Sequence, residues 1–353
     1  MPSTGNTCRI RTSGGCISGG QRAYAWAKAC GIIGKSFTGK RVSAIAGINR
    51  LSELDRLVFP GASRDLPEKE LMKDIEKRII NRAADAIRVV VDSFDPVPEF
   101  LVLLIRGWEY ENLKNALTAL EGGTGGRPSF VDLKNFATIN FSAWPDIKAM
   151  LSLTEFEYLL KLKDKDSFHL QTELDRHYYS SLWKALCRLG RNDRLVSEKI
   201  LGEEISLRNF VCALRLRTYY QMNRNEIIPH LVDIKTVKNR KTVSLAADAI
   251  ASLDFPLDER QAWMSCGRAR FLNSETSAGV WMADPRFVQN ASARYLYRMA
   301  RKSFRTRPFS LDSIFCFIKI KQFEEDVLTS FAEGLGMGMN AGDVFSMFGV
   351  EPQ

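Results

Sequence analysis

A chain of 353 residues with 45% hydrophobic and 26% charged residues has the composition of a folded globular protein, which excludes a short module and a largely disordered chain. By the usual size of domains it can hold two or three units of about 100 to 200 residues. The formal net charge of +9 favours acidic partners: nucleic acid, anionic lipid or an acidic protein surface.

The longest apolar runs are too short to cross a bilayer. FLVLLI at 100–105 stops well below the roughly 18 residues that a spanning helix needs. Residues 1–20 contain no apolar run of a signal peptide, and we expect them to form a mobile tail. The seven cysteines are scattered without a CxxC pair, so we expect a reducing, cytoplasmic setting and neither a disulfide framework nor a zinc site.

The first third of the chain has helical periodicity. Residues 21–59 carry small and apolar side chains at intervals that predict two closely packed helices. Residues 66–94 predict an amphipathic helix that Pro96 and Pro98 end. A further helix is expected from about 99 to 121, followed by a flexible connection, EGGTGGRP.

The remainder repeats this pattern. We predict helical structure over 154–190, a long helix from about 196 to 221, and a polar linker at 233–241. A final long helix should begin after Ser310, a plausible N-cap, and stop at Gly334.

Signals for strands are nearly absent, so the sequence predicts an all-α fold. Aligning the three long helices places Asn112, Asn209 and Val327 at equivalent positions, 209 − 112 = 97 and 327 − 209 = 118 residues apart. We therefore expect three divergent helical bundles, with boundaries at 21–128, 129–240 and 241–353, that form a pseudo-threefold ring or funnel.

The asparagines interrupt apolar stripes. In GWEYENLKNALTAL, Asn112 lies on the same stripe as Trp108 and Ala116. A buried amide can donate and accept, so it can satisfy backbone groups left free where a neighbouring helix bends or ends. The alternative, that the asparagines line a ligand site, is weakened because Val327 replaces the third one.

Enzyme motifs are lacking. His169, His177 and His230 share no motif, and surface or capping roles suit them better than metal binding. The glycines of GLGMGMNAG at 334–342 follow a helix rather than a strand and lack the GK[ST] ending of a phosphate loop. We expect no catalytic residue, metal or cofactor, and no ATP site.

Several segments together resemble the C-type subunit of the bacterial and archaeal V-type (A-type) ATPase, the counterpart of the eukaryotic d-type subunit. They are YAWAKACGIIGKSFTGKRVSAI, WEYENLKNAL, ISLRNFVCALRLRTYY, NEIIPHLV and FIKIKQFEEDVLTSFAEGLGMG. The resemblance covers the chain from about residue 20 to the end. The matching motif residues on the three long helices are Glu109, Asn112, Leu113 and Leu117, then Ser206, Asn209, Phe210, Leu214 and Arg215, then Glu324 and Leu328.

This resemblance implies a non-catalytic rotor subunit. Family members are funnels that sit on the cytoplasmic end of the membrane proteolipid ring and receive the foot of the central stalk, so that rotation passes through them during ion transport or ATP synthesis. Polar positions on the repeated helices, Lys114, Arg208 and Arg217, are candidate partner contacts. Arg301 and Lys302 are candidates for a basic rim facing acidic stalk surfaces or anionic lipid.

A helical nucleic-acid-binding protein is the alternative. RYLYRMARKSFRTRP at 294–308 interleaves six basic residues with three aromatic ones. A solvated helix face whose aromatic rings point into the core explains the same pattern better. The coupling hypothesis expects no nucleic-acid partner.

Overall fold

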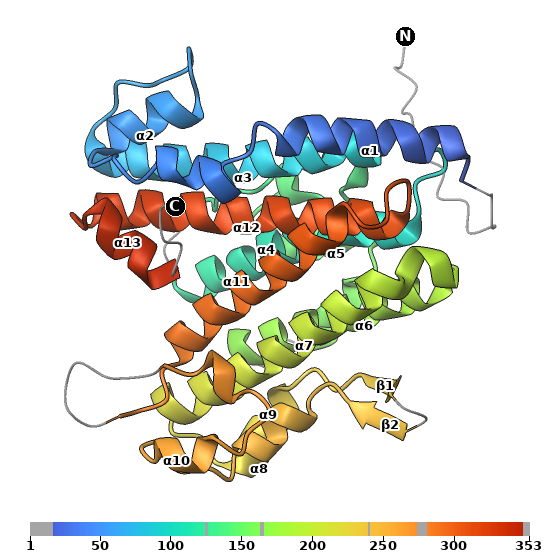
Figure 1. Ribbon diagram of the computed structural model, residues 1–353, viewed down its shortest axis with the longest axis vertical. Coiled ribbons are helices and arrows are strands. Elements are labelled where there is room, and N and C mark those ends of the chain that lie inside the picture. The colour runs from blue at the N-terminus through green and yellow to red at the C-terminus, as the bar shows by residue number, and fades with distance from the viewer. Residues whose placement is uncertain (1–16, 124–125, 163–165, 239–240, 274–280, 349–353) are drawn as a thin grey trace.

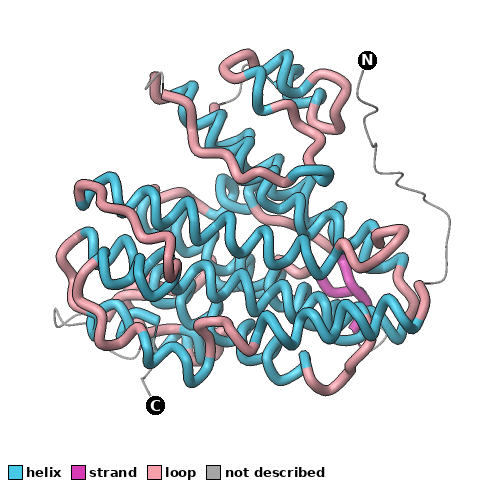
Figure 2. The backbone as a smooth tube through the Cα atoms, turned by 90° about the horizontal axis from the view of Figure 1, so that it is seen from above, coloured by secondary structure: helices cyan, strands magenta, loops and turns pink. Residues whose placement is uncertain are grey.

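The computed structural model describes residues 17–123, 126–162, 166–238, 241–273 and 281–348, and within them it confirms the predicted all-α fold (Figures 1 and 2). The predicted tail at 1–20 falls mostly outside the described residues, and helix α1 already begins at Gly19, capped by Ser18. The long helices are α1 Gly19–Ile33, α3 Glu68–Val91, α4 Glu99–Glu121, α6 Ser167–Arg188, α7 Arg191–Tyr219, α11 Pro285–Phe304 and α12 Leu311–Gly336. The short ones are α2 Leu51–Val58, α5 Ile147–Leu151, α8 Arg224–Ile227, α9 Ala247–Ser252, α10 Arg260–Trp263 and α13 Ala341–Phe348.

Six of the long helices form three hairpins: α3 with α4, α6 with α7, and α11 with α12. The second helix of each hairpin packs extensively on the first helix of the next: α4 on α6, α7 on α11 and, closing the circle, α12 on α3. Figure 1 shows α1 and α3 lying along α12, with α6 and α7 side by side below them. The helix pairing is therefore cyclic rather than a row with two free ends.

Contacts between the hairpin turns hold one end of the molecule together. Arg22 of α1 pairs with Asp193 at 2.5 Å, and Arg188 pairs with Glu99 at 2.7 Å. Arg307 donates to the backbone carbonyl of residue 192. The halves of the hairpin helices next to these turns share one hydrophobic core, which includes Phe100, Leu186 and Phe315 from three different hairpins.

At the opposite end the core divides. One cluster joins α12 and α3 to residues 37–58 and α13, and a second joins α4 and α6 to residues 139–162. Two further clusters join α7 to α11 and to the short helices between them. We call the three peripheral parts lobes: residues 34–67 with 339–348, residues 129–162, and residues 221–238, 241–273 and 281–284. The molecule thus has one shared core at the turn end and separate cores at the lobe end.

The second and third lobes contain most of the differences from the predicted elements. Residues 233–241 are not a linker, because β1 Lys235–Lys238 and β2 Lys241–Ser244 pair antiparallel as a small hairpin, the single magenta pair in Figure 2. The strand sequences KTVK and KTVS each contain the β-branched residues Thr and Val, but they are too short and polar to produce a clear strand signal. Helical structure over 154–190 is interrupted, since 3₁₀ helix η4 covers Glu157–Leu162 and α6 starts after the N-cap Asp166.

Two predicted features of the N- and C-terminal regions also need correction. Helices α1 and α2 pack mainly on α3 and α12, with 3₁₀ helix η1 Gly39–Ala44 between them. Helix α12 is capped by Ser310 as predicted but continues past Gly334 to Gly336. A Cβ on Gly334 would lie 2.5 Å from the Val344 side chain, so the missing side chain lets α13 pack closely on α12.

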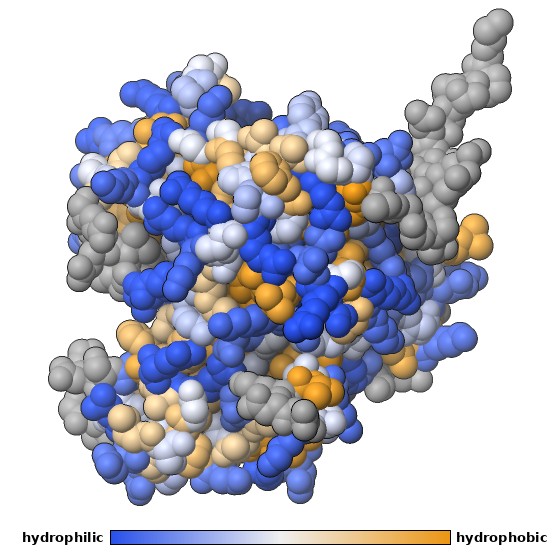
Figure 3. Space-filling view, turned by 45° about the vertical axis from the view of Figure 1, so that its right-hand side comes forward, coloured by the Kyte–Doolittle hydropathy of each residue, from blue (hydrophilic) through white to orange (hydrophobic). Residues whose placement is uncertain are grey.

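No helix within the described ranges combines the length and apolarity that crossing a bilayer requires. On the face shown in Figure 3, hydrophilic residues predominate and apolar ones are scattered among them.

Candidate functional site

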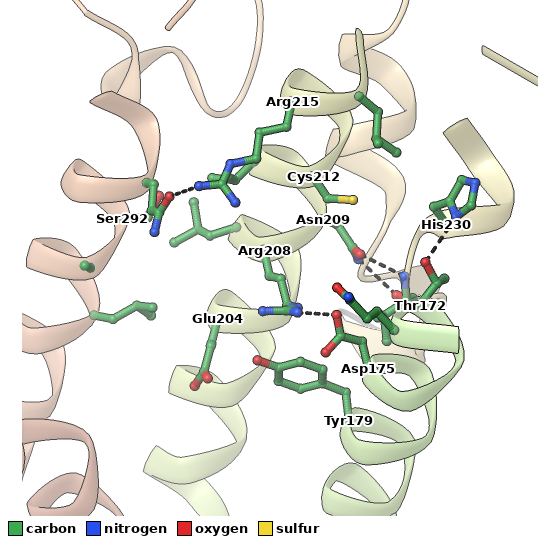
Figure 4. A pocket seen from close by; sticks show the side chains of 18 of the residues that line it. Thr172, Asp175, Tyr179, Glu204, Arg208, Asn209, Cys212, Arg215, His230 and Ser292 are labelled. Atoms are coloured by element: carbon green, nitrogen blue, oxygen red, sulfur yellow. Dashed lines mark hydrogen bonds and ion pairs between the residues drawn. The ribbon is translucent and has the colours of Figure 1, made fainter. Parts of the chain in front are cut away.

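A charged groove lies between α6, α7 and α11 where the shared core gives way to the lobes (Figure 4). Its volume is about 540 Å³. Helix α7 contributes a row of polar side chains spaced three or four residues apart, so that they share one face of the helix. These are Glu204, Arg208, Cys212 and Arg215. Asp175 of α6 and Asp326 of α12 also line the groove.

An ion-pair network fixes one wall of the groove. Arg208 and Lys114 both donate to Asp175, with 2.5 Å between Lys114 Nζ and Asp175 Oδ1. Burial opposes ionisation of Asp175, but the two cations outweigh it and lower the pKa of the carboxyl. Because Lys114, Asp175 and Arg208 belong to α4, α6 and α7, the network joins three helices.

A second set of acids lies on α12. Asp326 is accessible to water but surrounded by protein in the hollow, and this desolvation raises its pKa to about 6 although Lys319 lowers it. Glu325 accepts from Trp108 Nε1 at 3.3 Å, and burial followed by repulsion from Asp326 raises its pKa to about 8. Lys319 also forms a 2.7 Å ion pair with Glu204. Of these two acids, Asp326 lines the groove, whereas Glu325 is directed to Trp108 outside the groove lining.

The repeated asparagines bond to backbone, although Asn209 also lines the groove. Asn112 Nδ2 donates to the Val131 carbonyl and its Oδ1 accepts from the Val131 amide, both at 2.9 Å. Asn209 bonds in the same two-way manner to Val232, at 2.9 and 2.8 Å, and also donates to Leu245 O at 3.3 Å. Each amide thus ties a long helix to the chain segment that enters the adjacent lobe.

The acidic residues three positions before the repeated asparagine position also bond to backbone groups of the lobes. Fully buried Glu109 accepts from the backbone amides of residues 138 and 139. Glu324 accepts from the Phe37 amide at 2.7 Å and pairs with buried Lys321. At the second copy Ser206 replaces the acid and accepts from Arg268, which also bonds Glu203 at 2.6 Å.

The other predicted motif residues differ in burial. Leu214 and Leu328 are in the core, Leu117 is partly buried, and Arg215 lies exposed in the groove beside Gln289.

The predicted partner contacts fall in three different places. Lys114 is buried and engaged by two carboxylates, and Arg217 donates to the carbonyls of residues 252 and 255, so both hold the protein's own elements together. Arg208 reaches the groove but is paired with Asp175. Arg301 and Lys302 are exposed on the last turn of α11, away from the groove.

The aromatic residues of the basic segment pack inward. Tyr297 stacks on Phe323 at a centroid distance of 4.2 Å, Phe304 meets Trp26 at 5.1 Å, and Tyr295 meets Phe271 at 5.3 Å. These rings offer no platform for stacked bases, so the segment behaves as a solvated helix face.

The histidines form structural contacts. His177 bonds Tyr110 Oη at 2.7 Å, His169 bonds its own N-cap Asp166, and His230 bonds Thr172 at 3.1 Å. In the part of the chain that the structure describes, no three His, Cys, Asp or Glu side chains are grouped so that they could hold a metal ion.

Sequence reasoning missed Asp175, Arg268 and Asp312. Asp312 is buried and accepts from the Ser197 amide and hydroxyl at 2.8 and 2.6 Å, joining α12 to α7. A charged residue on the apolar stripe of a helix indicates that it is buried with a partner. The partner of Asp312 lies on another hairpin, at no fixed spacing in the sequence, so it cannot be identified from the sequence.

Comparisons with known proteins identify relatives of the chain by sequence. The family model described as ATP synthase (C/AC39) subunit matches residues 62–344. An uncharacterized protein of Treponema pallidum (strain Nichols) is 26% identical over 318 residues, which cover 89% of this chain and 92% of that protein.

Proposed function

Because the chain belongs to the C/AC39 subunit family of V/A-type ATP synthases, we propose that it is a non-catalytic coupling subunit that links the central stalk to the membrane proteolipid ring. In this role it forms a peripheral part of a membrane-bound complex, on the cytoplasmic side. ATP hydrolysis or the ion gradient drives rotation, and the subunit transmits that rotation between stalk and ring.

The main support for this proposal is that the turn end has one shared hydrophobic core whereas the lobe end has separate ones. A torque coupler needs a rigid body, and the cyclic packing of three helix hairpins around a common core supplies one. It also needs a recess for a partner, and at the lobe end the separate cores leave a groove with a polar lining. We propose that the stalk foot enters at the lobe end and that the turn end faces the ring.

The charged side chains that line the groove suit a partner bound by electrostatic contacts. Arg215 and Asp326 are exposed in the groove, while Asp175 and Arg208 already satisfy each other. Charged and polar contacts give specificity and orientation without one large apolar seam.

The test is whether ion transport is uncoupled from ATP hydrolysis. In membranes of the native cell, we expect the double variant Arg215→Glu/Asp326→Lys to keep ATP hydrolysis by the catalytic part while ATP-driven ion transport falls at least about tenfold, as expected when opposite charges are replaced by like ones across an interface. The matched control is Lys148→Glu/Glu259→Lys, which changes two exposed residues in lobes and should transport normally. Normal transport by the groove variant would contradict the proposal.

A further inference from the structure

A row of exposed cations runs along the C-terminal half of α11 and the turn that follows α1. We call it the cationic ridge; it consists of Arg298, Arg301, Lys302 and Arg305 with Lys35, Lys40 and Arg41. Arg298, Arg301 and Lys302 lie in the last turns of α11 and Arg305 is its C-cap; Arg298 and Lys302, and likewise Arg301 and Arg305, are four residues apart along one side of the helix. Among the described residues, none of the seven has a carboxylate within ion-pair distance.

One close contact joins the two halves of the ridge, and one electrostatic interaction agrees with it. The Arg301 guanidinium lies against Gly39, where a Cβ would be 2.5 Å from Nη2, and Gly39 adopts a φ of +60° that disfavours any side chain. Arg305 is close enough to Cys30 of α1 to lower that thiol's pKa, although burial raises it more. The ridge is thus one continuous surface built from two chain segments.

The ridge differs from several basic residues elsewhere on the long helices. Arg22, Arg188 and Arg208 each pair with a carboxylate of another element. The ridge cations repel one another instead, and an external anion would relieve that repulsion.

The surroundings of the ridge favour a lipid headgroup layer over the other acidic partners. The aromatic rings of the α11 segment face the core, which removes the base-stacking contacts of a single-strand binder. A protein interface usually has an apolar centre and a polar rim. Here the exposed apolar residue, Phe309, lies at the end of the ridge, 54% exposed and 6.1 Å from Trp26 between ring centroids.

We propose that the cationic ridge binds anionic phospholipid headgroups of the membrane surface, with Phe309 entering the interfacial layer. Basic residues on a helix face attract anionic lipid, and an adjacent aromatic ring adds apolar burial at the headgroup level. The inference rests on the proposed function only in assigning the protein to a membrane surface. The ridge joins the turn-end half of α11 to residues 35–41 at the edge of the first lobe.

The experiment measures co-sedimentation of the isolated full chain with vesicles. We expect binding to phosphatidylcholine vesicles that contain phosphatidylglycerol and little binding to pure phosphatidylcholine. The variant Arg298→Glu/Lys302→Glu/Arg305→Glu should lower the partition coefficient at least about tenfold. Phe309→Ala should lower it by a smaller factor that persists at high salt, because its contribution is apolar.

The matched control reverses three exposed, unpaired cations elsewhere. Lys69→Glu/Lys148→Glu/Arg260→Glu changes net charge equally and should keep most of the binding. Circular dichroism and urea midpoints establish that all variants fold. An equal loss in ridge and control variants, absence of binding to anionic vesicles, or tighter binding to duplex DNA at equal phosphate concentration would overturn the inference. None of these outcomes affects whether the chain co-purifies with ATPase subunits, so the two proposals fail separately.

Discussion

At the residue scale, a single amide can fix the path of a distant segment. The position of Asn209 on an apolar stripe could be recognised from the sequence as a polar group requiring partners. Its partners, the backbone groups of Val232 and Leu245, could not, because they lie 23 and 36 residues away in an irregular segment with no periodicity. The sequence therefore predicts the need for a hydrogen bond but not the lobe that meets it.

Replacing Asn209 by leucine should reduce the free energy of unfolding by about 3 kcal/mol, because the buried amide and carbonyl of Val232 lose their partner. Urea denaturation followed by circular dichroism measures the change. Asn115→Leu serves as control on the exposed face of α4 and should cost less than about 0.5 kcal/mol. Equal effects of the two substitutions would argue against a structural role for the Asn209 amide.

The pKa of Glu325 predicts a pH-dependent stability. Burial raises this pKa to about 8 in the folded protein, from its ordinary value of 4.5. Between these values the folded state holds the proton more tightly than the unfolded state, so the contribution of Glu325 to stability falls as pH rises from 4.5 to 8. Glu325→Gln should therefore raise the melting temperature relative to wild type more at about pH 8 than at about pH 5.

Scanning calorimetry at the two pH values checks this expectation. The glutamine can still accept from Trp108, so the comparison isolates the charge. Glu259→Gln, at an exposed position, should give the same small change at both pH values. A Glu325→Gln effect that does not depend on pH would contradict the assigned shift.

At the element scale, the long helices are predictable and their assembly is not. Apolar periodicity and caps such as Ser310 locate α3, α4, α7 and α12 to within several residues. Strands β1 and β2 have four residues each and the 3₁₀ segments of the lobes have three to six, too few for a periodic signal. The lobes fold because the long helices supply buried polar anchors for them.

Glu324 provides such an anchor, joining α12 to the N-terminal lobe. Glu324→Ala should cost about 3 kcal/mol, because it leaves the Phe37 amide and the buried Lys321 ammonium without their carboxylate. We expect faster hydrogen exchange across residues 35–59, measured by mass spectrometry, with little change at the turn end.

A double variant separates lost charge pairing from general damage. Glu324→Ala/Lys321→Met removes both buried charges and should recover part of the stability, since an uncompensated ion costs more than an apolar side chain. Exchange that rises uniformly over the whole chain in Glu324→Ala would show that this carboxylate does not act locally.

At the scale of the whole molecule, the cores suggest a repeat that differs from the predicted boundaries at 128 and 240. We propose that each unit runs from the second helix of one hairpin, through a lobe, to the first helix of the next. In this scheme α12 is completed by α13 and by residues 34–91, so the third unit is shared between the two ends of the chain. Sequence alignment of linear segments cannot reveal such a unit, because its parts are about 300 residues apart.

The groove illustrates the same limit at the functional site. Arg208 and Arg215 could be selected from the sequence as polar positions on a repeated helix. Asp175 comes from the other helix of the same hairpin, α6, and Asp326 comes from α12 of another hairpin. Ion pairing within the chain also determines which cations can meet a partner. Lys114 is already paired with Asp175, whereas Arg215 is exposed to the groove.

Everything proposed for the whole molecule depends on this chain coupling a stalk to a membrane ring. The most direct measurement is to tag the chain in its native cell, solubilise the membranes gently, and weigh the intact complex by native mass spectrometry. We expect one copy of the chain together with proteolipid ring and central-stalk subunits. Recovery of the chain alone, or with nucleic acid and no ATPase subunit, would contradict it.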